Sequence, residues 1–135
     1  IQRVIRLPEI TRLPQTPDFI KGVINLEGEV VPIIDMHERF GLEKREYDTS
    51  TRVIIVKLME KDVGMIVDSV SQVRVVMNKE IEKVTEVISG ISKEYIAGIA
   101  KISDSMVILL KIEKILTSKE FTVVSKAGKG KKTKK

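Results

Sequence analysis

The sequence of 135 residues contains no cysteine, no tryptophan and a single histidine. Without cysteine the chain has no disulfide framework, no zinc site built on thiolates and no cysteine nucleophile. A single imidazole also excludes a site with several histidine ligands in one chain. The sequence shows neither a signal-peptide pattern nor an apolar run long enough to cross a bilayer. We therefore expect a soluble protein of a reducing compartment that holds no metal and no cofactor.

The formal net charge of +5 is unevenly distributed along the chain. Residues 126–135 contain six lysines and no acidic residue, whereas residues 1–125 carry a net charge of −1. We expect the lysine-rich segment to be a disordered tail. The balanced body and its few aromatic residues favour protein partners, because nucleic-acid binding needs basic residues beside exposed aromatic rings. A nucleic-acid-binding double barrel stays open as an alternative.

Short runs rich in β-branched residues, separated by turn residues, predict three β-hairpins. Short helical turns are expected after the first and third hairpins, at 36–40 and 111–116. Helix content is otherwise low, and this spacing of short strands is typical of small β-barrels. The predicted strand pairs are 19–26 with 29–35, 52–58 with 63–68, and 95–102 with 106–110, and 73–77 is predicted as a further strand.

An internal repeat supports two barrels of similar construction. Residues 19–40 align without a gap with residues 95–116, a shift of 76 positions that superposes Gly22 on Gly98. Such a repeat indicates a duplicated unit. The hairpin at 52–68 has no counterpart before Ile1, so we expect roughly 18–20 residues of the first barrel to be absent from this chain.

The repeat leads to a prediction of how the chain is divided. The first barrel is incomplete at its N-terminus, and the second barrel contains the middle hairpin. The predicted parts are barrel 1 at 1–50 with part of the C-terminal region, barrel 2 at 51–116, a C-terminal segment at 117–125, and the tail at 126–135.

The sequence offers no set of residues that would support catalysis. His37 follows Asp35 closely, but residues one or two apart do not face each other on a helix. We expect His37 to be a surface histidine, or one with satisfied hydrogen bonds, at the start of a helix, and Asp35 to cap the helical turn that follows it. Gly22 and Gly28 lack the lysine and hydroxyl residues that a phosphate-binding loop requires. The protein is not expected to be an enzyme.

Two long motifs, at 5–14 and 17–35, closely resemble those of the CheW family of bacterial chemotaxis adaptors. The first is Ile-Arg-Leu-Pro-Glu-Ile-Thr-Arg-Leu-Pro, and the second contains Phe-Ile-x-Gly-Val-Ile-Asn-Leu-x-Gly-x-Val-Val-Pro-Ile-Ile-Asp. Segments at 63–70 and 95–116 match in the same order. The resemblance implies an all-β fold of two small five-stranded Src-homology-3-like β-barrels with short helices, and no catalysis.

The resemblance also implies partners for the chain. It indicates binding to the regulatory domain of the histidine kinase CheA and to the cytoplasmic tips of chemoreceptors, with ring contacts among CheA and CheW-like barrels. The implied location is the cytoplasm, with recruitment to receptor arrays at the inner face of the membrane and no insertion into it. Alternatively, the chain is the CheW-like part of a larger protein, such as CheA itself or CheV.

Transferred residue by residue, the resemblance implies a receptor-binding groove. Two of its positions depart from the family pattern. The family usually has Asn-Leu-Arg-Gly where this chain has Glu27, and often an acidic residue where this chain has Arg3. We therefore expect Arg3 and Glu27 to face each other as an ion pair of inverted sense. The implied site residues are Ile1, Arg3, Gly22, Glu27, Val53 and Gly64.

Overall fold

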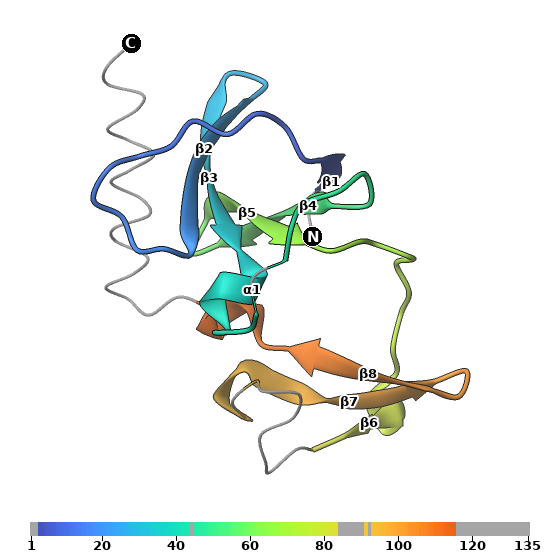
Figure 1. Cartoon of the computed structure of the whole chain (residues 1–135). Helices are drawn as coiled ribbons and strands as arrows, with labels where there is room; N and C mark the ends of the chain where they lie inside the picture. The colour runs from blue at the N-terminus through green and yellow to red at the C-terminus, as the bar shows by residue number, and fades with distance from the viewer. Residues whose placement is uncertain (1–2, 44, 84–90, 92, 116–135) are drawn as a thin grey trace. The chain divides into compact units, whose positions relative to one another are not determined.

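The computed structural model describes residues 3–43, 45–83, 91 and 93–115. These residues form two compact units, one ending at Val70 and one spanning Ser71–Ile115 (Figure 1). Strands make up most of the regular structure in both units, which confirms the predicted all-β class. Each unit is built around its own sheet.

The first unit contains a five-stranded sheet in the order β1-β4-β5-β3-β2. Neighbouring strands run antiparallel, except that β3 and β5 are parallel. Parallel pairing needs a crossover connection, and here α1, the loop after it and β4 lie between β3 and β5 in the chain. The elements are β1 (Arg3–Arg6), β2 (Ile20–Leu26), β3 (Glu29–Asp35), α1 (Met36–Arg39), β4 (Arg52–Leu58) and β5 (Lys61–Val67).

β-Branched side chains from β2, β3, β4 and β5 fill the core of the first unit. Isoleucine and valine pack well on a pleated surface, and they also favour the extended backbone that the strands need. Partly buried residues of β1, β2 and the β1–β2 connection pack against this cluster. The buried cluster consists of Ile24, Val31, Ile33, Val53, Ile55 and Ile66.

The placement of β4 and β5 corrects the predicted domain division. The sequence assigned this hairpin to the second barrel, whereas both strands lie in the middle of the first sheet. The parallel pairing of β5 with β3 brings Gly64 opposite Ile33 in the sheet of the first unit. The first unit therefore has five strands, and the prediction that it lacks a hairpin is wrong.

The second unit has three strands among its described residues, in the order β6-β7-β8. The segment 73–77, predicted to be a strand, pairs with none of them. Among the residues that the structure describes, this unit therefore has fewer strands than the first. The elements are the 3-10 helix η1 (Asn78–Glu80), β6 (Ile81–Glu82), η2 (Lys93–Tyr95), β7 (Ile96–Ile102), β8 (Ser105–Leu110) and η3 (Ile112–Lys114). The predicted parts at 117–125 and 126–135 lie outside the described residues.

The β7–β8 hairpin reproduces the β2–β3 hairpin pair by pair at the predicted shift of 76. Ile20 pairs with Ile34 and Ile96 with Leu110, and each hairpin then has a bulge before its glycine. Both two-residue turns adopt positive φ at both positions, as the primed turns of hairpins require. The structure therefore confirms the internal repeat.

Two local predictions have different outcomes. Asp35 caps α1 as expected, because its Oδ1 accepts a hydrogen bond of 3.2 Å from the backbone N–H of Glu38. The β4–β5 turn, expected at 60–62, instead lies at Met59 and Glu60, which both have positive φ. Neither residue is a usual turn former, so local composition did not indicate this position.

Candidate partner-binding site

Three of the six predicted site residues lie in one row across the first sheet. Arg3 pairs with Ile55, Ile55 with Gly64, Gly64 with Ile33, and Ile33 with Gly22. The row thus takes one residue from each of the five strands and ends on the two edge strands. The parallel pairing of β3 with β5 aligns residues that lie far apart in the sequence.

Glu27 is connected to this row through Arg3. The Nη1 of Arg3 donates a hydrogen bond of 2.7 Å to Oε1 of Glu27, which confirms that the two side chains face each other. Glu27 lies in the β2–β3 turn, where the Oδ1 of Asn25 accepts a hydrogen bond from the Gly28 backbone N–H. The Arg3 and Glu27 side chains are 44% and 76% exposed. An exposed pair of this kind contributes only about 0–1 kcal/mol to stability, so its charges are available to a partner.

Gly22 is a position where two backbones meet. A Cβ on Gly22 would lie 2.1 Å from the carbonyl oxygen of Thr11, and its φ is +144°. That carbonyl also accepts a hydrogen bond of 2.9 Å from the Val23 N–H, which fixes its place. Gly22 therefore shapes the first unit and offers no side chain to a partner.

Val53 and Gly64 belong to the core of the first unit. Val53 is fully buried. A Cβ on Gly64 would approach the Cδ1 of Ile33 to 2.5 Å and the Cγ1 of Val53 to 2.9 Å, so the missing side chain makes room for both. Ile1 lies outside the described residues. Among the predicted site residues that are described, only Arg3 and Glu27 present exposed side chains.

A second polar cluster, which the sequence did not indicate, surrounds His37. Its Nε2 lies 2.9 and 3.0 Å from the carboxylate oxygens of Asp68, just after β5, and its Nδ1 lies 3.1 Å from the Glu43 carbonyl oxygen. Arg45 donates to the same Asp68 carboxylate at 3.2 Å. His37 and Asp68 are 31 residues apart, and no local pattern connects them.

We expect the stability of the first unit to depend on the protonation of His37. The hydrogen bond to Asp68 raises the pKa of His37 above its ordinary 6.5, although burial partly opposes this. The stabilisation is therefore fully present below pH 6.5 and is lost as the pH rises through the raised pKa. For a partly exposed pair it amounts to about 1 kcal/mol or less. Thermal unfolding of wild type and His37→Gln between pH 5 and about 8.5 tests this; parallel pH profiles of the two proteins would contradict it.

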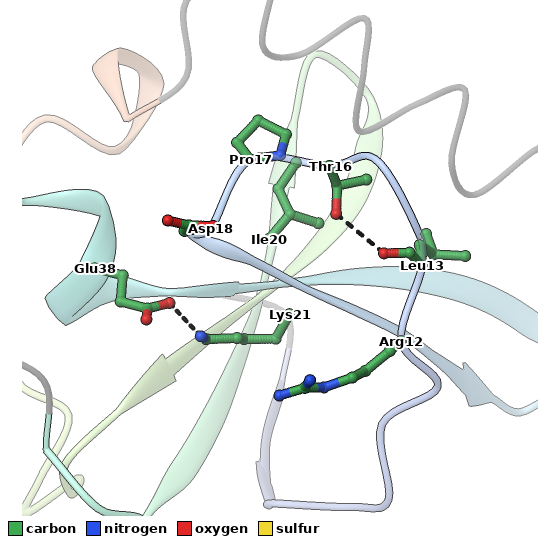
Figure 2. Close-up of a pocket in the computed structure, with 8 residues that line it drawn as sticks. All are labelled: Arg12, Leu13, Thr16, Pro17, Asp18, Ile20, Lys21 and Glu38. Atoms are coloured by element: carbon green, nitrogen blue, oxygen red, sulfur yellow. Dashed lines mark hydrogen bonds and ion pairs between the residues drawn. The ribbon is translucent and has the colours of Figure 1, made fainter.

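A polar cleft of about 370 Å³ opens beside β2 and α1 (Figure 2). Lys21 and Glu38 form an ion pair in it, and both side chains are largely buried. The loop before β2 closes one side, where the Thr16 hydroxyl donates to the Leu13 carbonyl oxygen. The Arg12 side chain points into the same space as Lys21 in Figure 2. The cleft has mixed charge, and no sequence motif indicated it.

The part of the chain that the structure describes lacks two kinds of feature. It contains no group of three or more histidine, cysteine, aspartate or glutamate side chains placed to hold a metal ion. None of its helices combines the length and apolar character that spanning a membrane requires.

Comparisons with known proteins agree with this architecture. The chemotaxis protein CheW of Klebsiella aerogenes is 37% identical over 129 residues, which cover 96% of this chain and 78% of that protein. CheW of Thermotoga maritima is 29% identical over 123 residues, covering 91% and 78%. The crystal structure of the scaffolding protein TtCheW from Thermoanaerobacter tengcongensis matches with a TM-score of 0.79 and 36% identity over 88% of this chain and 77% of that one.

The family comparison covers nearly all of the chain. The model of the CheW-like domain matches residues 1–120. Together with the TtCheW match, it confirms the predicted double barrel of Src-homology-3 type. The chain belongs to the CheW-like domain family.

Proposed function

We propose that this chain is a non-catalytic adaptor of bacterial chemotaxis that couples chemoreceptors to the histidine kinase CheA. The observation that carries the proposal is the match of the CheW-like domain over residues 1–120, accompanied by relatives named as chemotaxis protein CheW. The proposed adaptor catalyses no reaction. It acts by holding two protein partners at fixed positions relative to each other. Recruitment to receptor arrays at the inner face of the membrane is part of this proposal.

The exposed ion pair gives the proposed receptor-binding surface its charge pattern. Arg3 and Glu27 present a cation and an anion side by side on the first unit. Gly22, Val53 and Gly64 contribute to this surface indirectly. They set how closely the strands and the β1–β2 connection approach one another. Charged residues at the rim of an interface act mainly on partner choice and association rate. The inverted sense of the pair selects receptors of matching charge pattern.

We expect Glu27→Arg to weaken binding of a cognate receptor cytoplasmic fragment by about tenfold, which corresponds to 1.4 kcal/mol. The reason is that two cations then repel each other and present the wrong charge to the receptor. The double variant Arg3→Glu/Glu27→Arg restores a pair and its stability, but in the opposite sense, so its binding stays weak. Titration calorimetry against the fragment measures both, and circular dichroism checks folding.

Glu60→Arg is the matched control for this experiment. Glu60 also occupies a two-residue hairpin turn in the first unit, is exposed, and has a positive φ of 66°, close to the 51° of Glu27. The substitution changes net charge by the same amount, at the second position of its turn where Glu27 holds the first. Equal losses of binding in Glu60→Arg and Glu27→Arg would contradict a local role for the ion pair.

A pulldown tests the coupling itself. The full chain is mixed with the regulatory domain of CheA, with a receptor cytoplasmic fragment, or with both. We expect each partner to be retained alone and the three proteins to form a complex together. Retention of neither partner by a folded chain would contradict the proposed function.

A second candidate is the CheW-like part of a larger signalling protein. It is favoured by a match to the chemotaxis protein CheV3 of Helicobacter pylori, which is 28% identical over 119 residues covering 86% of this chain but 38% of that protein. An immunoblot of native cells with an antibody against this chain distinguishes the two candidates. If the chain is part of a larger signalling protein, the detected band migrates far above 15.2 kDa.

A further inference from the structure

The second unit contains a cleft of about 390 Å³ at the start of β7. This volume lies within the range of about 300–1,000 Å³ that is usual for sites that bind small organic molecules. The buried Ile96 and its neighbour Ala97 contribute apolar surface, and the rest of the described lining is charged. The charged side chains are those of Lys83, Lys93, Glu94 and Lys111. We call this site the lysine cleft.

The lysine cleft is the repeat counterpart of the polar cleft beside β2 and α1. The shift of 76 places Asp18 and Ile20 of the polar cleft on Glu94 and Ile96 of the lysine cleft. Each pair of counterparts lines its own cleft, in the first unit and in the second. The same hollow is therefore built twice in the chain.

The backbone supports this correspondence between the clefts. The N–H of Asp35 donates to the carbonyl oxygen of Phe19, and the N–H of Lys111 donates to that of Tyr95, both at 2.8 Å. Residues 10–11 and 81–82 each crowd the glycine of their own hairpin. The next residue lines the cleft in both units, and it is basic in both, Arg12 in the first and Lys83 in the second.

The two clefts differ in charge. In the polar cleft Lys21 is paired with Glu38, and Arg12 and Asp18 add one charge of each sign (Figure 2). In the lysine cleft three lysines accompany one glutamate, a net charge of +2. The other charged residues of the second unit, four basic and five acidic, have a net charge of −1. The positive charge of this unit is therefore gathered at the cleft.

The excess of positive charge arises where the two copies of the repeat differ. Ala97 takes the place of Lys21, and three neutral or acidic positions of the first unit become lysine in the second. These pairs are Pro17 and Lys93, Asp35 and Lys111, and Glu38 and Lys114. Among the described residues, no ion pair involves the three lysines of the cleft. Their mutual repulsion is unfavourable, and an anion bound between them would relieve it.

We propose that the lysine cleft binds a small organic anion that carries a phosphate or pyrophosphate group. Lysine binds phosphate as a point charge, whereas a single carboxylate is better matched by the planar fork of arginine. The net charge of +2 suits a multiply charged anion, although Glu94 opposes its binding. The apolar surface of Ile96 and Ala97 accepts the organic group attached to the phosphate. This site is independent of the proposed receptor-binding surface, which lies on the first unit.

ADP and inorganic pyrophosphate, without divalent cations, are the probes for the full chain. We expect ADP to shift the backbone amide signals of 93–97 and 111 in NMR spectra, with saturation below about 1 mM. Pyrophosphate should bind more weakly, because it brings no group to the apolar surface. The amides of 12–21 are an internal control, since the polar cleft has balanced charge. Signals resolved by residue also separate the cleft from the six lysines of 126–135.

Substitutions in the cleft should change the affinity in opposite directions. Lys93→Gln and Lys111→Gln each remove a cation, so ADP should bind about three- to fivefold more weakly. Glu94→Gln removes a carboxylate that repels the anion, so ADP should bind about twofold more tightly. A merely structural role of these side chains would not produce a gain of affinity in Glu94→Gln.

Lys101→Gln is the matched control. Lys101 is exposed, belongs to β7 and loses the same charge, but it does not line the cleft. It lies four residues beyond Ala97, roughly 13 Å along the strand, which exceeds the screening length of about 8 Å at physiological salt. Its affinity for ADP should stay close to that of the wild type.

Three results would overturn the proposal. The first is the absence of saturable shifts at 93–97 and 111 with either probe. The second is an equal response of the amides at 12–21, which would show that the charge of the lysine cleft does not matter. The third is an equal loss of ADP affinity in Lys101→Gln and Lys93→Gln. Pyrophosphate binding as tight as that of ADP would contradict the role of Ile96 and Ala97.

Discussion

Gly22→Ala is expected to lower the free energy of unfolding of the first unit by about 3 kcal/mol, near the upper end for an overpacked site. The added Cβ would lie 2.1 Å from the Thr11 carbonyl oxygen. That oxygen cannot simply move away, because the Thr11 carbonyl and N–H both bond the backbone of Val23. The φ of +144° adds a conformational cost for any residue with a side chain.

Gly28→Ala separates the conformational cost from the steric one. Gly28 also has positive φ, at +86°, but a Cβ there would meet no atom within 4 Å. We expect a loss of about 1 kcal/mol for this substitution, the cost of left-handed backbone alone. Urea unfolding followed by the NMR signals of Tyr47 reports the first unit in both variants. Equal destabilisation would show that backbone conformation, and not the contact with Thr11, requires glycine at residue 22.

The features that the sequence predicted well are local or repeated. The Glu27-Gly28 turn, the Asp35 cap and the strands on either side follow from residues next to one another in the chain. Because of the internal repeat, the strands and the turn of the third hairpin could be predicted in the same way. The pairing of Arg3 with Glu27 is a different case, because it was inferred from two departures from a family pattern that compensate each other in charge.

The features that the sequence did not predict depend on which distant strands pair. Both copies of the repeat have the same order of elements, so the order alone cannot tell which unit receives the hairpin of β4 and β5. The structure resolves this through the parallel pairing of Gly64 with Ile33. The His37–Asp68 contact follows from the same pairing, because it brings the end of β5 beside α1.

The residues that the family resemblance assigned to a receptor-binding groove lie partly side by side in the structure, and their role in binding stays a prediction. Arg3, Gly22 and Gly64 share one row of the first sheet, so the family resemblance selected residues that are neighbours in space. Among the described members of the set, only Arg3 and Glu27 have side chains exposed enough to contact a partner directly. Residue type alone does not show whether a glycine is buried. Glycine is required both in exposed turns and where two backbone segments approach closely.

Asp35→Ala is expected to destabilise the first unit by roughly 3 kcal/mol, by removing a helix cap and a buried hydrogen-bond acceptor together. Asp35 is 3% exposed. One carboxylate oxygen accepts from the Glu38 N–H and the other from the Tyr47 hydroxyl, at 2.5 Å. Burial, followed by the hydrogen bond to Asp35 and its negative charge, raises the pKa of Tyr47, so this hydroxyl stays protonated and donates throughout the neutral range.

Two further variants separate these two contributions. Asp35→Asn keeps a side-chain oxygen for the cap and should cost less than alanine. Tyr47→Phe keeps the cap but leaves one oxygen of a buried carboxylate without its donor, so we expect a loss of about 1–2 kcal/mol. Urea unfolding of the three variants gives the comparison. If Asp35→Ala costs no more than Tyr47→Phe, the cap contributes nothing, and the stabilising role of Asp35 is limited to its hydrogen bond with the loop that precedes β4.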